Sequence, residues 1–441
     1  RDVTGVQTCA LPILNFHLTA GEIEYQVGES GARLMFVDSA TRAAALEATA
    51  GREVTVVELP DTGIQGGLAA FIEGTPWVSL RDDQPVRPNL LFTSGTTGRP
   101  KAVQLPPKTI GDSPDLAGFR KLITTQRMAK YGTHLVIGPL YHNGPGVWSC
   151  QALLGGNHVV LLPRFDAEAT LAAIERHRGT VLYSVPTMMK RIWRLPDDVK
   201  FGFDLSSLRV VWHLAEPCPE WLKQVWIDWL GPERIYELYA GTEAQTATII
   251  TGAEWLAHRG SVGRAQPGTV MITDPDGNEL PVGEKGEVWL RSVRDTPTYI
   301  YVGATPRTRE GGWESLGDMG HVDADGYLYL GDRAADMILS GGANIYPAEV
   351  EAALQEYHGV HSCAVIGLPD DDKGNTIHAI VEADASTIDL DDLKAFLGER
   401  LVVYKLPRTF EFVDTPLRDD AGKVRRSDRK STRLNSSHIT I

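Results

Sequence analysis

The sequence has few cysteines, no long apolar run and no excess of basic residues. Four cysteines occur in 441 residues, and no two of them form a C-x-x-C pair: Cys9, Cys150, Cys218 and Cys363. This scarcity argues against a disulfide framework and against a cysteine zinc site, and it favours a reducing, cytoplasmic compartment. No apolar run approaches the roughly 20 residues that a transmembrane helix needs, so we expect no membrane span.

The charge balance is acidic. Lysine and arginine total 43 and aspartate and glutamate total 57, which gives a formal net charge of -14. A field of this sign repels nucleic acid and anionic membrane surfaces, so we expect neither as a partner. An acidic net charge still allows a local basic pocket for a small polyanion.

The two ends of the chain differ from everything between them. Residues 1–13 and 428–441 show none of the periodicity of their neighbours. Both resemble translated adapter sequence at the edges of an assembled gene fragment, so we expect non-native tails there. For the C-terminal piece, a natural disordered tail is the alternative.

Between these ends the sequence shows three successive patterns of apolar and polar residues. From about residue 33 to 250, apolar strands alternate with helical patterns, as in HVVLL followed by DAEATLAAIERH. Such units predict an α/β fold with mostly parallel, helix-covered sheets. From about 260 to 332, alternating strands joined by Asp-Gly turns predict a small antiparallel β subdomain. Residues 333–427 carry two amphipathic helical patterns and apolar strands, which predict a small α+β C-terminal domain after a large domain over 14–332.

The stretch LLFTSGTTGRPKAV, residues 90 to 103, follows an apolar strand with a loop rich in Gly, Ser and Thr. Loops of this kind bind phosphate through backbone amides and hydroxyl groups. The spacing is not that of a Walker P-loop, because Gly95 and Gly98 are too close and Pro100 precedes Lys101. A tight turn without a ligand is the alternative.

The order TSGTTGRPK after a strand resembles the phosphate-binding signature of the adenylate-forming superfamily, which comprises acyl-CoA synthetases, luciferases and peptide-synthetase adenylation domains. The resemblance implies that the following residues bind the nucleotide: Thr93, Ser94, Gly95, Thr96, Thr97, Gly98 and Lys101.

Further motifs resemble the same superfamily in the same order. YELYAGTEA resembles its Y-G-x-T-E stretch, with Ala240 in place of glycine. This match implies that Tyr239 stacks on adenine, that Thr242 contacts the α-phosphate and that Glu243 ligates Mg²⁺. A carboxylate oxygen is the ligand that this hard cation prefers.

The C-terminal motifs continue the series. ESLGDMGHVDADGYLYLGDR resembles the ribose-binding segment, in which Asp318 would accept bonds from both ribose hydroxyls and Arg333 would contact ribose or phosphate. PLRDDAGKVRR resembles the motif whose lysine, here Lys423, acts at the carboxylate–phosphate junction.

SGGANIYPAEVE resembles the face presented after a domain rotation, with Gly342 in the pantetheine tunnel. The hinge position is usually Asp or Lys and is Ala335 here, so we expect altered rotation kinetics rather than altered chemistry.

Two further segments concern adenine and the acid. HLAEPCP stands where the superfamily commonly has G-G-A-P, so Ala215 and Glu216 are candidate adenine contacts that replace small residues. PLYHNGPG resembles the loop whose histidine, here His142, gates the carboxylate; an ordinary structural histidine is the alternative. Four large apolar side chains are candidates to line an acyl cavity, and an ordinary place in the core is the alternative: Trp148, Met188, Met189 and Trp212.

Together these motifs identify the chain as an AMP-forming acyl-CoA ligase that uses ATP, Mg²⁺ and coenzyme A. The run from WHLAEPCPEWLKQ to YAGTEA resembles bacterial ligases for fatty, steroid-type or bile acids, so the expected partner is an apolar carboxylic acid. YKLPR, residues 404 to 408, is typical of CoA-using members. One alternative is an adenylating enzyme that uses the same first step with another acceptor. The superfamily normally has a further stretch before residue 14, so a truncated nucleotide-binding fragment without catalysis is the other alternative.

Overall fold

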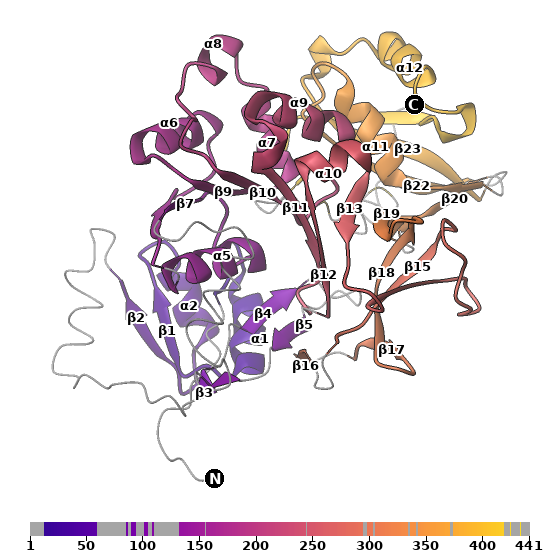
Figure 1. The fold of residues 1–441 in the computed structure, drawn as a ribbon. Helices are drawn as coiled ribbons and strands as arrows, with labels where there is room; N and C mark the ends of the chain where they lie inside the picture. The colour runs from indigo at the N-terminus through magenta and orange to yellow at the C-terminus, as the bar shows by residue number, and fades with distance from the viewer. Residues whose placement is uncertain are drawn as a thin grey trace.

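The computed structural model shows a large N-terminal domain and a small C-terminal domain (Figure 1). The structure describes residues 13–59, 85–86, 90–93, 101–104, 108–109, 132–154, 156–243, 245–293, 298–302, 305–333, 336–340, 343–370, 374–418, 424 and 433. The mixed α/β class predicted from the sequence is confirmed.

Parallel strands form one half of the largest sheet. They are β7 (Thr133–Val136), β8 (His158–Leu161), β9 (Val181–Ser184), β10 (Val210–His213) and β11 (Ile235–Ala240). Their order across the sheet is β11-β10-β9-β7-β8. Every residue of β9 and β10 is buried, as expected for strands that are covered on both faces.

Helices cover both faces of this parallel half. They are α5 (Asn143–Leu154), α6 (Ala167–His177), α7 (Pro186–Trp193), α8 (Asp197–Lys200), α9 (Glu220–Leu230) and α10 (Gly252–Ala257), with a 3-10 turn over Pro232–Arg234. Figure 1 shows α6, α7 and α9 on one side of the strands and α5 on the other. Helix α7 starts at Pro186, whose fixed φ and missing N–H suit a first helical turn.

The same sheet continues into an antiparallel half. Its strands are β12 (Ala247–Thr251), β13 (Ser261–Arg264), β14 (Val270–Thr273), β15 (Gly286–Leu290), β17 (Arg307–Arg309), β18 (Trp313–Val322) and β19 (Tyr327–Arg333). The predicted antiparallel texture is confirmed, but it begins at β12 rather than at about residue 260. Because β12 folds straight back along β11, the antiparallel strands extend one twelve-stranded sheet instead of forming a sheet of their own.

A separate three-stranded sheet brings distant segments together. It consists of β4 (Leu90–Thr93), β5 (Lys101–Gln104) and β16 (Ile300–Val302), with β5 in the middle. The Gly-rich loop therefore connects the two strands of an antiparallel hairpin, with Thr93 opposite Lys101 at its base. On the other side of β5, Tyr301 lies opposite Val103.

Smaller elements complete the N-terminal domain. They are α1 (Ala20–Ser30), β1 (Leu34–Val37), α2 (Arg42–Ala48), β2 (Thr55–Glu58), β3 (Pro85–Val86) and β6 (Lys108–Thr109). Helix α1 begins with a capping box in which Thr19 and Glu22 satisfy each other's backbone amides.

The C-terminal domain has its own apolar core. Its elements are β20 (Ile338–Ser340), β21 (Ala343–Ile345), α11 (Pro347–Glu356), β22 (Ser362–Asp370), β23 (Gly374–Glu382), α12 (Leu390–Gly398) and β24 (Thr409–Val413), with 3-10 turns over Ala385–Thr387 and Val403–Lys405. Val350 and Leu354 of α11 and Leu393 and Leu397 of α12 are completely buried in it. The amphipathic spacing predicted both helices correctly.

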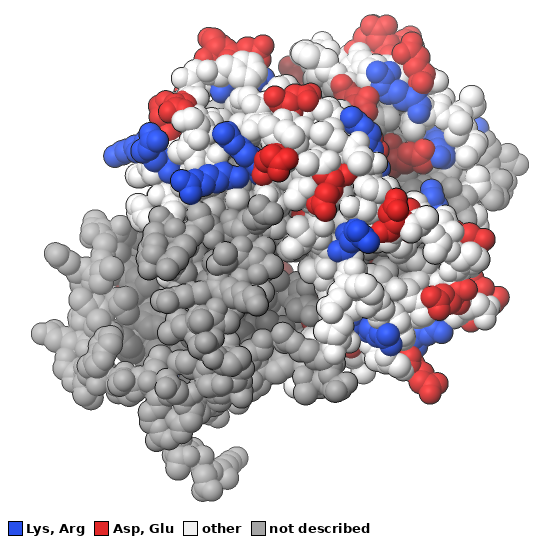
Figure 2. Space-filling view, viewed as in Figure 1, with Lys and Arg blue, Asp and Glu red and all other residues white. Residues whose placement is uncertain are grey.

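The surface carries both signs of charge. On the face drawn in Figure 2, acidic and basic side chains are interspersed over the described residues. Within the described ranges, no helix has both the length and the apolar character needed to cross a bilayer.

His134 of β7 makes the stability of this fold depend on pH. Its side chain is buried, and its Nε2 has no hydrogen-bond partner among the described residues. Burial lowers the pKa of the His134 imidazole to about 4. Because the unfolded chain takes up this proton near pH 6.5, the free energy of unfolding should fall by about 3 kcal/mol between pH 6.5 and 4. We expect His134→Leu to flatten this acid-side decline in urea unfolding curves; an unchanged slope would contradict the buried neutral ring.

Candidate functional site

Lys101 and Tyr301 meet where the hairpin of the Gly-rich loop joins β16. The Tyr301 hydroxyl accepts a hydrogen bond from Lys101 Nζ at 2.6 Å, and the same ammonium group lies 4.0 Å from the centroid of the tyrosine ring. The two residues are 200 positions apart in the chain. Their contact fixes the basic end of the loop motif against β16.

Glu243 completes this cluster from the loop after β11. Its side chain is only 8% exposed, its Oε1 lies 3.6 Å from Lys101 Nζ, and it accepts a short hydrogen bond from the Tyr301 hydroxyl. The Thr298 hydroxyl donates to the Glu243 backbone carbonyl at 2.8 Å, which fixes the loop itself. The structure thus brings together two residues that the sequence assigned to one site, Lys101 and Glu243.

The tyrosine in this cluster is held protonated. Burial raises the pKa of the Tyr301 hydroxyl well above its usual value, and its hydrogen bond to Glu243 raises it further. The hydroxyl therefore remains a donor to the carboxylate at all physiological pH values. Such an arrangement keeps one carboxylate oxygen oriented beside a cation, which suits a site for phosphate and a hard metal ion.

A second tyrosine, Tyr299, directly precedes β16 and packs beside the cluster. Tyr299 donates to Glu314 Oε2 at 2.7 Å, and Gln245 Nε2 donates to the same oxygen at 2.8 Å. The rings of Tyr299 and Tyr301 contact each other edge to face, with centroids 4.7 Å apart. Sequence reasoning missed both tyrosines, although their Y-x-Y spacing places them on one face of a strand.

The adjacent loop passes close to the cluster at Gly241. A Cβ there would lie 2.6 Å from Leu316 Cδ1 and 2.9 Å from Glu243 Oε2, so a larger residue would displace these side-chain ends. Half-buried Thr242 follows at the same end of β11.

Tyr239 of β11 and Asp318 of β18 form a side-chain pair between two strands that are not adjacent in the large sheet. The Tyr239 hydroxyl donates to Asp318 Oδ2 at 2.7 Å, although 79 positions separate the residues. Asp318 on β18 lies opposite Arg333 on β19 in the strand register. The backbone thus places these three predicted nucleotide contacts together.

The segment HLAEPCP holds an alanine in a backbone conformation that usually carries glycine. Ala215 has a φ of +73°, in the left-handed region that favours glycine. The Glu216 side chain turns inward, and Thr187 Oγ1 donates to its Oε2 at 2.8 Å. The Glu216 carboxylate therefore points toward the interface of the two domains.

The predicted acyl-site residues lie close to the parallel strands. His142 precedes α5, and its ring contacts that of Tyr141 at 4.4 Å between centroids. In the same loop, a Cβ on Gly144 would overlap the Tyr183 hydroxyl, so glycine is required there. The large apolar residues are all at most 6% exposed and belong to the main core: Trp148, Met188, Met189 and Trp212.

The remaining predicted residues lie outside the described part of the chain: Ser94, Gly95, Thr96, Thr97, Gly98, Gly342 and Lys423, with the hinge residue Ala335. For Thr93 and Arg333 the structure describes the backbone alone.

Comparisons with known proteins give the family. The model of the family described as "AMP-binding enzyme" matches residues 7–300, and that of "AMP-binding enzyme C-terminal domain" matches residues 349–423. A feruloyl-CoA synthase from Amycolatopsis sp. is 35% identical over 93% of this chain and 81% of its own length. A fatty acid–[acyl-carrier-protein] ligase from Streptomyces coeruleorubidus is 31% identical over 96% of this chain and 81% of its own length.

A solved structure has the same fold. The crystal structure of ATP-bound MatB from Rhodopseudomonas palustris superposes with a TM-score of 0.77 at 26% identity, and the match covers 96% of this chain and 83% of that one. The resemblance that the motifs indicated is confirmed: the protein belongs to the family of AMP-binding enzymes.

Proposed function

We propose that this AMP-binding enzyme activates a carboxylic acid with ATP and transfers the acyl group to coenzyme A. A carboxylate oxygen bonds to the α-phosphorus while the bond to pyrophosphate breaks. The thiolate of coenzyme A then bonds to the acyl carbon, and AMP leaves. The observation that carries the proposal is the Lys101–Tyr301–Glu243 cluster, which lies on the same end of the domain as the Tyr239–Asp318 pair.

The first step is electrostatically difficult, because an anion must approach a polyanion. Lys101 and the backbone amides from Thr93 to Gly98 would neutralise phosphate charge. Lys423 would do so at the carboxylate–phosphate junction, and Thr242 would contact the α-phosphate. A buried carboxylate beside a cation fits an Mg²⁺ ligand, so Glu243 would hold the ion, which when bound offsets negative charge on the phosphates.

Asp318 is assigned to the ribose. An ionised carboxylate offers about four acceptor positions, so Asp318 can accept from Tyr239 and from a diol at the same time. The same bond fixes the Tyr239 ring, which we assign to adenine. Ala215 and Glu216 of the HLAEPCP segment are assigned to adenine as well. Arg333 is assigned to ribose or phosphate. Gly342 is assigned to the pantetheine path after rotation of the C-terminal domain, which we place from residue 333 onward.

The acid itself is proposed to be apolar, of the acyl, aromatic or steroid type. The loop of His142, which we assign as the carboxylate gate, lies beside a core rich in tryptophan and methionine. Trp148 contacts both Tyr183 and Trp212, with ring centroids 5.7 and 5.9 Å apart. A cavity bounded by such side chains recognises shape and apolar area rather than charge.

A second candidate function uses the same first step with another acceptor. One of the relatives is named for delivering a fatty acid to an acyl carrier protein rather than to coenzyme A. We favour coenzyme A because of the YKLPR segment. A cytoplasmic location is part of the proposal, since Cys150, Cys218 and Cys363 are all free thiols.

The decisive assay is AMP release over a panel of aliphatic, aromatic and steroid-type acids, with and without coenzyme A. We expect release that needs both the acid and coenzyme A. Acid-dependent pyrophosphate release that coenzyme A leaves unchanged, with acylation of a carrier protein, would favour the second candidate. Nucleotide binding with no turnover on any acid would overturn both.

Asp318→Asn tests the ribose assignment. Replacing the charged acceptor should weaken ATP binding about tenfold, because hydrogen bonds to charged groups contribute about 1.5–3 kcal/mol. Binding of 2′,3′-dideoxy-ATP should hardly change, since it lacks the donors. Isothermal titration with both nucleotides checks this, and equal weakening of both would contradict the assignment.

Tyr301→Phe tests the cluster around Glu243. Loss of the hydroxyl removes a donor to the carboxylate and an acceptor for Lys101, so MgATP should bind about 3- to 10-fold more weakly. Tyr299→Phe is the matched control: its hydroxyl donates to Glu314, and binding should stay within about twofold. Equal effects of the two changes would show that the Tyr301 hydroxyl has no special role.

A further inference from the structure

The two domains meet through polar side chains between α7 and α11. Lys190 Nζ donates to Gln355 Oε1 at 3.0 Å, and Arg194 Nη2 donates to the Gln355 carbonyl at 3.2 Å. Lys190 is only 2% exposed, and burial lowers the pKa of its ammonium group to about 8. An ammonium group is thus removed from water at a contact between domains.

Arg418 bridges the domains at the same place. Its Nη1 lies 3.6 Å from Glu216 Oε2 of the N-terminal domain, and its Nη2 lies 3.8 Å from Glu351 Oε2 of α11. Its Nε donates to Ser362 Oγ at 3.1 Å, which holds the guanidinium on the C-terminal side. The side chains of Arg418, Glu216 and Glu351 are 11%, 6% and 5% exposed, so this bridge is almost dry.

The Glu216 carboxylate depends on this bridge for its charge. Burial raises its pKa to about 7, while Arg418 and the hydrogen bond from Thr187 act in the opposite direction. A buried charge that loses a counter-charge is costly. The Arg418 contact therefore favours one relative orientation of the domains over orientations in which Glu216 stays buried alone.

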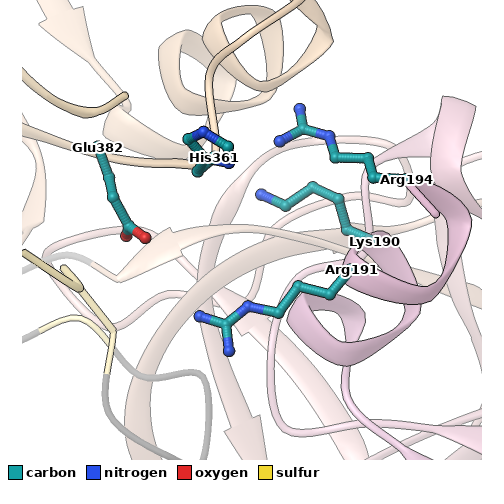
Figure 3. Close-up of a pocket in the computed structure, with 5 residues that line it drawn as sticks. All are labelled: Lys190, Arg191, Arg194, His361 and Glu382. Atoms are coloured by element: carbon teal, nitrogen blue, oxygen red, sulfur yellow. The ribbon is translucent and has the colours of Figure 1, made fainter. Parts of the chain in front are cut away.

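A cavity lies between the two domains, next to Lys190 and Arg194. It has a volume of about 350 Å³ and is lined by Lys190, Arg191, Arg194, His361 and Glu382. Figure 3 shows the three basic side chains extending from α7 toward His361 and Glu382 of the C-terminal domain. Such a polar, open space admits water, which can solvate the charged groups as the domains separate.

Arg418 belongs to the same sequence motif as Lys423. Arg418 stands five residues before Lys423, and five extended residues span at most about 18 Å. Glu216 lies just after β10, at the carboxyl end of the parallel strands where ligands bind in such sheets. Arg418, which belongs to the motif assigned to adenylate formation, is therefore anchored at that end of the N-terminal domain.

We propose that Arg418 is a positioning residue for adenylate formation: its ion pairs with Glu216 and Glu351 hold the C-terminal domain in the orientation that delivers Lys423. This inference rests on the proposed function, because it assigns Lys423 to the first half-reaction. It predicts that the second half-reaction, which uses the rotated domain, does not need the bridge.

Arg418→Gln separates the two half-reactions. We expect acid-dependent pyrophosphate release to slow about 10- to 100-fold, with the KM for ATP within about twofold, because a buried ion pair is lost while the nucleotide contacts remain. Thioester formation from synthetic acyl-adenylate and coenzyme A should keep its rate. Arg418→Lys should recover part of the loss, and Glu216→Gln should add little to Arg418→Gln, since both remove one interaction.

Arg400→Gln is the matched control. Arg400 pairs with Glu356 at 3.0 Å within the C-terminal domain, so both half-reactions should stay unchanged. If the Arg418 variants lose all activity, hydrogen exchange decides: amides of α7 and α11 should exchange faster in Arg418→Gln and not in Arg400→Gln. Equal loss of both half-reactions with unchanged exchange, or no loss at all, would overturn the inference. A wild-type enzyme that forms no adenylate would instead refute the proposed function.

Discussion

A carboxylate almost removed from water joins the twelve-stranded and the three-stranded sheets of the N-terminal domain. Glu243 follows the last parallel strand of the twelve-stranded sheet, and it accepts a hydrogen bond from Tyr301 in the three-stranded sheet. A buried carboxylate is stable only where donors and cations surround it, and here Lys101 and Tyr301 meet that need. The arrangement of Lys101, Tyr301 and Glu243 therefore depends on how β5 and β16 pair, and the contacts among these three side chains in turn stabilise that pairing.

The boundary between the domains follows the same physical rule. Glu216 and Glu351 are buried, and Arg418 lies between them. Apolar contacts would hold two domains equally well in a rotated and in an unrotated state, as long as both states bury the same apolar surface area. Charges that must be paired give a defined orientation instead, at the cost of desolvation. A polar interface with a cavity thus suits a domain that, in the function proposed above, leaves its position in every catalytic cycle.

The sequence allowed the prediction of what depends on local pattern. The strand before TSGTTGRPK, the proline at the start of α7 and the amphipathic helices of the C-terminal domain follow from spacing within about 15 residues. Motif resemblance added Tyr239, Asp318 and Glu243, which the structure places at one end of the domain. Tyr301 and Arg418 were missed because their partners are set by tertiary pairing: no local rule aligns β16 with β5 or turns Glu216 toward the other domain.

The position of β16 also has a consequence for how the chain is made. Until residues 300–302 have left the ribosome, β5 is an unprotected sheet edge, and its completely buried Val103 has no cover on that side. The 200 residues between Lys101 and Tyr301 take about 10 to 40 s to synthesise at ordinary bacterial and eukaryotic rates. During that interval the nascent hairpin is open to pairing with other chains, so chaperone demand should concentrate on this early segment rather than on the later, self-contained C-terminal domain.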